Sequence, residues 1–265
     1  MENAVTKSLA QRAVLEGKPI ELYGLKLWGI PMRQFEEWAK CKNVWLSRQS
    51  TFPVFCISMP FLDALLALDI QAMDETGAPA GYMNKILYGL AMALRMDVHS
   101  LNDGRLALTI DESRKRLRAI VIRQSDGIGP VEITPHKFNA VRQAVAWMQG
   151  EEVPDESMND ELVEAAMDLM QRNAPKLNYD MTDMLSSVAA AYGIRARDLY
   201  DWPILEFEAA RRAVDRRLKY MVCGIGATNG CKWDGGNPYP SWCFDKASEG
   251  TAALISPGQF GKAKH

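Results

Sequence analysis

The feature that most constrains the fold is a change in hydrophobic period along the chain. Apolar residues recur at a spacing of two at Leu106, Leu108 and Ile110 and again at Leu117, Ala119 and Val121, which is the period of strands with one exposed face. Over residues 35–45 and 83–94 they recur at spacings of three and four, which is the period of helices. The sequence therefore predicts an α+β fold that is predominantly helical, with a small antiparallel β-hairpin or three-stranded sheet in the middle and a helical C-terminal domain.

Residues 1–103 are predicted to form a strand element packed with helices. A helix over residues 1–17 is expected to place Val5, Leu9, Val14 and Leu15 on its apolar face and to end at Gly17. A single strand is predicted over residues 21–28, where apolar residues alternate. Helices follow it, and residues 77–81, rich in glycine and proline, are predicted to be a loop.

Three further segments complete the predicted organisation. Residues 104–150 hold the β-hairpin and a helix that begins with Thr134 as its N-cap and Pro135 at its first position. Residues 151–224 form a helical domain that begins with an acidic linker, and Asp180 is expected to cap a helix over residues 181–192. Residues 225–265 are predicted to be an irregular tail of glycine, proline and aromatic residues.

Composition excludes several classes of protein. The 31 basic and 33 acidic residues lack the positive excess of a nucleic-acid-binding domain. The richest apolar run, residues 61–70, is shorter than the roughly 20 residues that span a bilayer, and Asp63 and Asp69 interrupt it. The N-terminus lacks the pattern of a secretory signal. We therefore expect a soluble, cytoplasmic protein with no membrane partner.

The residues that usually carry chemistry do not form a recognisable catalytic or metal site. Seven residues separate Cys223 from Cys231 and eleven separate Cys231 from Cys243, whereas structural zinc uses closely paired ligands. The glycine-rich residues 223–230 follow a long helix and lack the Gly-Lys-Ser/Thr of a phosphate-binding loop. None of the three histidines accompanies a nucleophile in a known motif. We expect no enzymatic activity, no metal and no cofactor.

Residues 182–203 have the pattern of a helix-turn-helix, in which Arg195 and Arg197 would contact DNA. Asp198 lies in the second helix and would repel the phosphates that such a helix meets. The same pattern is typical of a corner between two helices, and that interpretation is preferred. The residues expected inside the corner are Tyr192, Ile194 and Leu199.

Several segments in a fixed order carry a resemblance to a known group of proteins. They are the Thr-Pro-x-x-Phe helix start at 134–138 with its continuation to Gly150, the helix over 183–193, the Leu-Tyr-Asp turn at 199–201, the helix over 207–220 and the Trp-Cys-Phe-Asp segment at 242–245. Residues 23–45, a strand followed by an aromatic and charged helix, also contribute. This order resembles proteins of tailed bacteriophages and prophages that act in tail morphogenesis, namely tail assembly chaperones and baseplate assembly proteins. The basic helix with Cys41 and the proline-rich tail depart from the pattern.

The resemblance implies a non-enzymatic, chaperone-like protein that binds a tail protein during virion morphogenesis, in the cytoplasm of the host cell. The implied partner is a tape-measure protein or a tube subunit, with a second copy of the chain as a further partner. A structural virion subunit and a helix-turn-helix DNA-binding protein are the alternatives. Because aromatic side chains bury large areas at little entropic cost, the predicted contact surface consists of aromatic residues. They are Trp38, Trp45, Tyr239 and Trp242.

Overall fold

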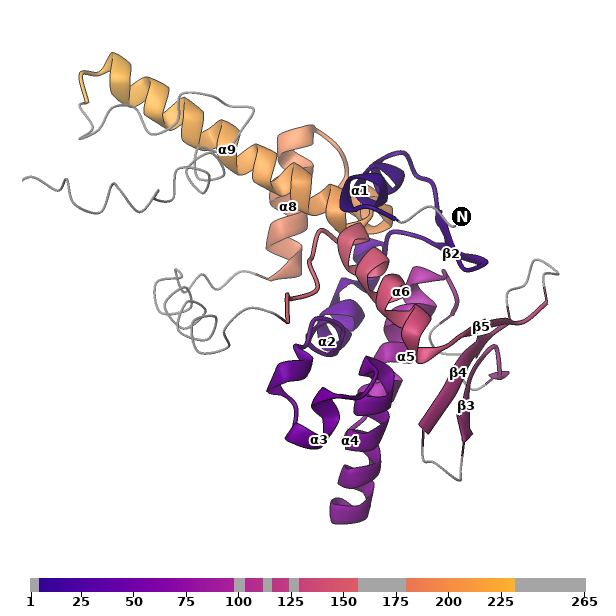
Figure 1. The fold of residues 1–265 in the computed structure, drawn as a ribbon. Coiled ribbons are helices and arrows are strands. Elements are labelled where there is room, and N and C mark those ends of the chain that lie inside the picture. The colour runs from indigo at the N-terminus through magenta and orange to yellow at the C-terminus, as the bar shows by residue number, and fades with distance from the viewer. Residues whose placement is uncertain (1–4, 98–102, 112–115, 124–128, 157–179, 232–265) are drawn as a thin grey trace, which may run out of the picture. The chain divides into compact units, whose positions relative to one another are not determined.

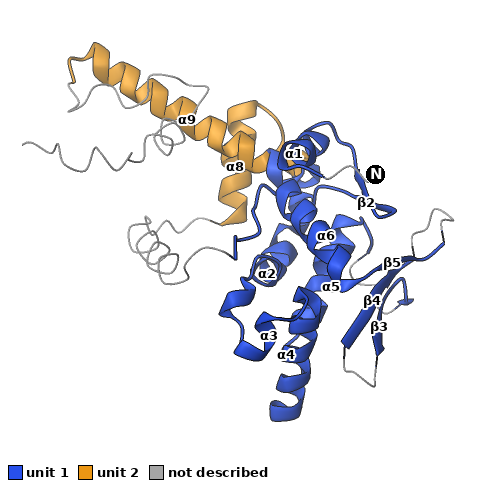
Figure 2. Ribbon diagram, viewed as in Figure 1, with its two compact units in different colours: residues 1–178, 200–206 blue, residues 179–199, 207–265 orange. Residues whose placement is uncertain are grey.

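The computed structural model shows a mixed α+β fold that is mainly helical, as predicted (Figure 1). It describes residues 5–97, 103–111, 116–123, 129–156 and 180–231. The chain divides into two compact units (Figure 2). Unit 1 consists of residues 1–178 and 200–206, and unit 2 of residues 179–199 and 207–265. The predicted segments 1–103 and 104–150 both fall in unit 1.

Unit 1 holds both antiparallel sheets and most of the described helices. In chain order its elements are α1 (Lys7–Leu15), β1 (Ile20–Leu22), β2 (Leu25–Leu27), η1 (Met32–Gln34), α2 (Phe35–Trp45), η2 (Gln49–Thr51), α3 (Val54–Ile57), α4 (Phe61–Thr76), α5 (Tyr82–Ala93), β3 (Leu106–Asp111), β4 (Arg116–Ile122), β5 (Val131–Ile133) and α6 (Pro135–Met148). The later elements are α8 (Met181–Tyr192), η4 (Ala196–Asp201) and α9 (Ile204–Thr228). Those labelled η are 3₁₀ helices.

The predicted single strand over residues 21–28 is instead a two-stranded hairpin. β1 pairs with β2 so that Leu22 lies opposite Leu25. Tyr23 and Gly24 make the turn with φ angles of 52° and 80°, the left-handed conformation that two-residue hairpin turns require. The prediction was wrong because a two-residue turn shifts the phase of alternation, so that Leu22 joins the buried face of Leu25 and Leu27.

The predicted apolar face of the first helix is corrected in part. α1 packs against α6 and buries Val14, as predicted, together with Ala10, whereas Leu9 and Leu15 are exposed. The buried pair is spaced by four residues and therefore occupies one helical face. A small residue such as Ala10 allows the two helices to approach closely, which the longer Leu9 side chain would prevent.

The middle of the chain forms the predicted three-stranded sheet and the helix that follows it. The strand order is β3-β4-β5, and both pairings are antiparallel. Thr134 occupies the N-cap position of α6 and Pro135 its first turn, as predicted. The apolar residues of α6 that recur at spacings of three and four are fully buried; they are Phe138, Val141, Val145 and Met148.

Four aromatic rings occupy the centre of unit 1. The ring centroid of Trp45 lies 5.5 Å from that of Phe138 and 5.9 Å from that of Trp38. Phe61 stacks on Phe138 with an interplanar angle of 3°. Trp38 and Trp45 are 2% and 0% exposed, so the prediction that they belong to a contact surface is wrong. Their spacing of seven residues places both on the face of α2 that packs against α5.

Unit 2 contains the predicted helical corner. The side chain of Asp180 accepts a hydrogen bond of 2.8 Å from the backbone N–H of Asp183, and Gly193 ends α8 with a φ of 67°, both as predicted. Leu199 is fully buried, but Tyr192 is exposed, so the expectation that its ring packs inside is wrong. Tyr192 is the last residue of α8, and the turn at Gly193 leaves this end of the helical face uncovered.

The last helix is longer than predicted. α9 continues through Gly224 and Gly226 to Thr228, and the chain turns at Gly230 with a φ of 81°. The prediction of an irregular tail from residue 225 onward is therefore wrong for the segment up to Thr228. A helical glycine costs only about 1 kcal/mol relative to alanine, which the neighbouring helix formers offset.

Candidate functional site

A groove with a volume of about 490 Å³ follows one face of α4 in unit 1. Figure 1 shows that α4 continues past the short helix α3. The α4 residues that line the groove are spaced as one helical face requires; they are Asp63, Ala67, Ile70, Gln71, Asp74 and Glu75. Phe55 and Met59 line it from the α3 segment, and Arg116 lines it from β4.

The α3 segment presents apolar side chains to solvent. Val54 is 85% exposed, Phe55 47% and Ile57 49%. Cys56, in contrast, is fully buried and anchors the turn against the core. Pro53 and Pro60 bound the segment, so the chain forms a single short helix here. Adjacent exposed apolar residues of this kind are typical of interaction surfaces.

Hydrogen bonds hold α3 in place. The side-chain amide of Gln49 donates to the backbone carbonyl oxygens of Cys56, at 2.7 Å, and of Ile57 and Met59. The Glu156 carboxylate in turn accepts hydrogen bonds from the backbone N–H groups of Gln49 and Ser50 at 2.8 and 3.1 Å. Gln49 satisfies carbonyl oxygens that a helix of one turn leaves without an intrahelical donor. These hydrogen bonds fix the backbone of α3 and therefore the position of its exposed apolar side chains.

Two aspartates of α4 are buried and fix the framework of the groove. Asp69 accepts hydrogen bonds from the backbone N–H groups of Tyr82 and Met83 at 3.0 and 2.8 Å and thereby caps α5. Asp63 Oδ1 accepts one from the backbone N–H of Leu117 at 2.9 Å, which ties α4 to β4. Asp63 is 7% exposed and its side chain also lines the groove.

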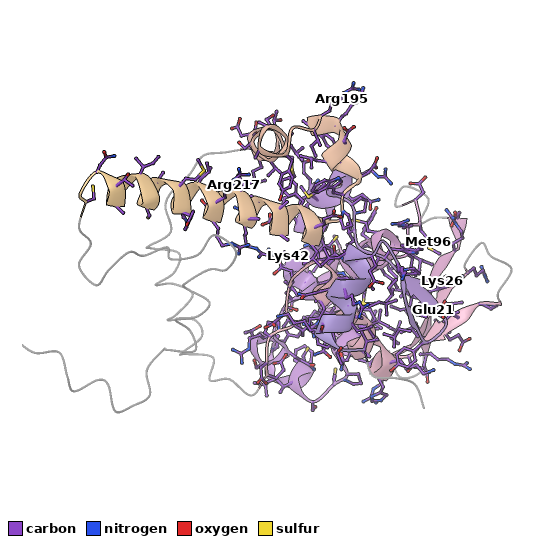
Figure 3. The ribbon with its side chains drawn as sticks, turned by 90° about the horizontal axis from the view of Figure 1, so that it is seen from above. Glu21, Lys26, Lys42, Met96, Arg195 and Arg217 are labelled. Atoms are coloured by element: carbon purple, nitrogen blue, oxygen red, sulfur yellow. The ribbon has the colours of Figure 1, made fainter. Side chains whose placement is uncertain are left out.

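A second apolar surface lies on α9 in unit 2. Phe207 and Ala210, early in the helix, are buried. Later residues at spacings of three and four continue the same face but are between 49% and 68% exposed; they are Leu218, Met221, Val222 and Ile225. We call these four residues the α9 stripe. Arg217 lies on the same part of the helix, where Figure 3 labels it.

The remaining predicted site residues are dispersed. Arg195 and Arg197 are exposed at the corner of unit 2, and Figure 3 shows Arg195 pointing outward. The predicted recognition helix is a 3₁₀ helix of six residues, and Arg197 pairs with Asp198 at 3.7 Å. Tyr239 and Trp242 lie outside the described residues, as does Cys243.

Within the described ranges, no group of three or more His, Cys, Asp and Glu side chains is arranged to hold a metal ion. Burial raises the pKa of the Cys41 and Cys56 thiols, which disfavours the thiolate form. His136 is exposed near the start of α6. No helix in the described part of the chain combines the length and the apolar character that crossing a bilayer requires.

The groove was not predicted from the sequence, although two features indicated it. Asp63 and Asp69 interrupt the most apolar run of the chain, and aspartates at such positions are usually hydrogen-bonded in the fold. Pro53 and Pro60 mark a segment too short to show a helical period. Its apolar residues therefore resembled ordinary core residues.

Neither a protein-family model, nor a curated protein, nor a solved structure matches the chain.

Proposed function

We propose that this chain is a non-enzymatic, chaperone-like assembly protein of a tailed phage or prophage. It binds an apolar segment of a tail protein, such as the tape-measure protein or a tube subunit, during virion morphogenesis. The sequence resemblance described above supports the biological setting. The binding role rests on the groove along α4 and the α3 residues beside it.

The observation that carries the proposal is the exposed apolar surface of α3. Val54, Phe55 and Ile57 of α3 expose large side chains, and Phe55 lines a groove whose lining also includes Ala67 and Ile70. Full burial of one such side chain contributes about 1.5–3 kcal/mol. Ordering two molecules costs several kcal/mol, so a contact of this size gives a weak and reversible complex. Reversible binding is what an assembly chaperone needs, since its client must later polymerise.

Co-expression of the chain with the tape-measure protein tests the proposal. We expect the full chain to keep that protein soluble and to be recovered with it in a complex. Phe55→Ser with Ile57→Ser is expected to reduce recovery of the complex at least about tenfold, because the apolar contact is lost. The control, Leu9→Ser with Leu15→Ser, changes two exposed apolar residues of α1 and should leave recovery unchanged.

Two outcomes count against the proposal. If the tape-measure protein and the tube subunit both stay insoluble and neither forms a complex with the chain, the chaperone role is wrong. If the chain instead copurifies with finished particles in fixed amounts, it is a structural virion subunit.

A further inference from the structure

The shape of the groove along α4 suits a helix. Its lining residues run from Asp63 to Glu75, so at a rise of about 1.5 Å per residue it extends for roughly 18 Å. A partner helix of about three turns would lie along this length. Phe55 of the α3 segment and Arg116 of β4 also line the groove. A groove that an amphipathic helix fills with its apolar face is a recurring mode of peptide recognition.

The polar residues of the groove are mainly acidic. Asp63, Asp74 and Glu75 face one basic residue, Arg116, among the described residues that line it. α4 has no basic residue in its last turn, where the negative end of the helix dipole adds to the field of Asp74 and Glu75. The groove therefore favours a partner with positive charge beside its apolar face.

Asp63 adds a specific point of attraction within the groove. Its Oδ1 accepts the Leu117 N–H, and the described part of the chain supplies no other recorded partner for this carboxylate. A buried carboxylate gains most from a charged donor, because the surrounding dielectric is low. A lysine or arginine side chain from above the groove would complete its hydrogen bonds.

We propose that the groove binds a basic amphipathic helix of the partner protein. The apolar face of that helix packs on Phe55, Met59 and Ile70. One of its lysine or arginine side chains reaches Asp63, and further basic residues face Asp74 and Glu75. This inference rests on the proposed function and specifies the chemistry of the segment that is bound.

Direct binding of synthetic peptides to the full chain tests this chemistry. Two fluorescent peptides of about 18 residues share one leucine face, and their polar faces carry either lysine or glutamate. We expect the lysine peptide to bind at least about tenfold more tightly in anisotropy titrations, and its affinity to fall as salt is raised.

Charge variants locate the contact. Asp74→Lys with Glu75→Lys should weaken binding of the lysine peptide at least about tenfold. The matched control, Glu36→Lys with Glu37→Lys, makes the same change in charge on α2 and should leave the affinity within about twofold. Arg114 and Lys115 precede Arg116 outside the described residues and are kept in every variant, so their contribution cancels in each comparison.

The Asp63→Asn variant tests the contribution of the buried negative charge, because it removes that charge and keeps a side chain of similar shape. An asparagine Oδ1 still accepts the Leu117 N–H, so the fold is retained, which the circular dichroism spectrum checks. Binding of the lysine peptide to the Asp63→Asn variant should weaken by about tenfold. Gln49→Ala should weaken the binding of both peptides, because α3 loses the hydrogen bonds that order it.

The inference is overturned if the two peptides bind equally, or if the α4 variant binds the lysine peptide as the wild type does. Its failure is distinct from failure of the proposed function. A chain that captures the tail protein without distinguishing the peptides contradicts the inference alone. A chain that prefers the lysine peptide but captures no tail protein contradicts the proposed function alone.

Discussion

Arg142 of α6 is a buried cation of unit 1. Its Nε donates a hydrogen bond of 2.6 Å to the carbonyl oxygen of Trp45, and a second guanidinium nitrogen donates to that of Ser47. The guanidinium carbon lies 3.7 Å from the ring centroid of Phe61. Burial lowers the pKa of Arg142 to about 10, and the carboxylate of Glu156 opposes this shift. The side chain thus remains charged at neutral pH and satisfies the carbonyls at the end of α2.

Replacing Arg142 with alanine should lower the free energy of unfolding by about 2–4 kcal/mol, because the carbonyls of Trp45 and Ser47 lose their charged donor inside the protein. Arg142→Met retains the apolar stem without the donors and should cost nearly as much. Arg118→Ala, an exposed arginine of β4, should change stability by less than about 0.5 kcal/mol. Urea unfolding followed by circular dichroism measures all three. A loss below about 1 kcal/mol for Arg142→Ala would show that water replaces the guanidinium.

At the scale of single residues, the burial of polar side chains was the feature that the sequence predicted least well. Apolar period identifies Phe138 and Ile86 as core residues, since burial of each depends on its own helical face. Arg142 is buried because carbonyls about a hundred residues earlier in the chain need a donor, and Asp63 because a distant strand supplies an N–H. A pattern within one element contains no information about such partners.

Gly89 determines how closely two helices approach. A Cβ atom at this position of α5 would lie 2.2 Å from Nε1 of Trp45 in α2. The Trp45 indole N–H donates to the carbonyl oxygen of Lys85 at 3.2 Å, so the ring has little freedom to move away. Gly224 of α9, in contrast, has no atom of the described residues within 4 Å of such a Cβ position. The same substitution in two helices therefore has opposite expected effects.

Gly89→Ala should destabilise the protein by about 3 kcal/mol, because the added methyl group displaces the Trp45 ring from the core. Gly224→Ala should stabilise α9 by up to about 1 kcal/mol through its higher helix propensity. Thermal unfolding followed by circular dichroism at 222 nm gives the sign of each change. Equal stability of the Gly89→Ala variant and the wild type would mean that α2 and α5 do not pack at this distance.

At the scale of elements, whether a segment forms a helix or a strand was more predictable than where that element begins and ends. The sheet of β3, β4 and β5 follows from alternation, and α8 follows from its cap and its terminal glycine. The β1–β2 hairpin was missed because its turn comprises two residues. The candidate groove was missed because it depends on β4 packing beside α3 and α4, and Leu117 of β4 follows Asp63 of α4 by 54 residues. No local period specifies that arrangement.

At the scale of the whole molecule, the α9 stripe bears on the state of the protein in solution. The apolar face of α9 is buried at Phe207 and Ala210 and exposed along the stripe. Side chains with the spacing of Leu218, Met221, Val222 and Ile225 pack well against another helix with the same spacing. Two copies of the chain supply such a pair of helices. Self-association through the stripe would be weak, because four partly exposed side chains bury a small area.

We expect the wild-type chain to associate with a dissociation constant of roughly 10–100 μM in sedimentation velocity runs over a range of concentrations. Met221→Ser with Ile225→Ser should keep the chain monomeric over that range. Its melting temperature should stay within about 2 °C of the wild type, because the replaced side chains contribute little burial in the single chain.

The Leu9→Ser, Leu15→Ser variant should associate as the wild type does, since α1 lies in unit 1. A wild-type chain that remains monomeric at the highest concentration would exclude the stripe as a contact between copies.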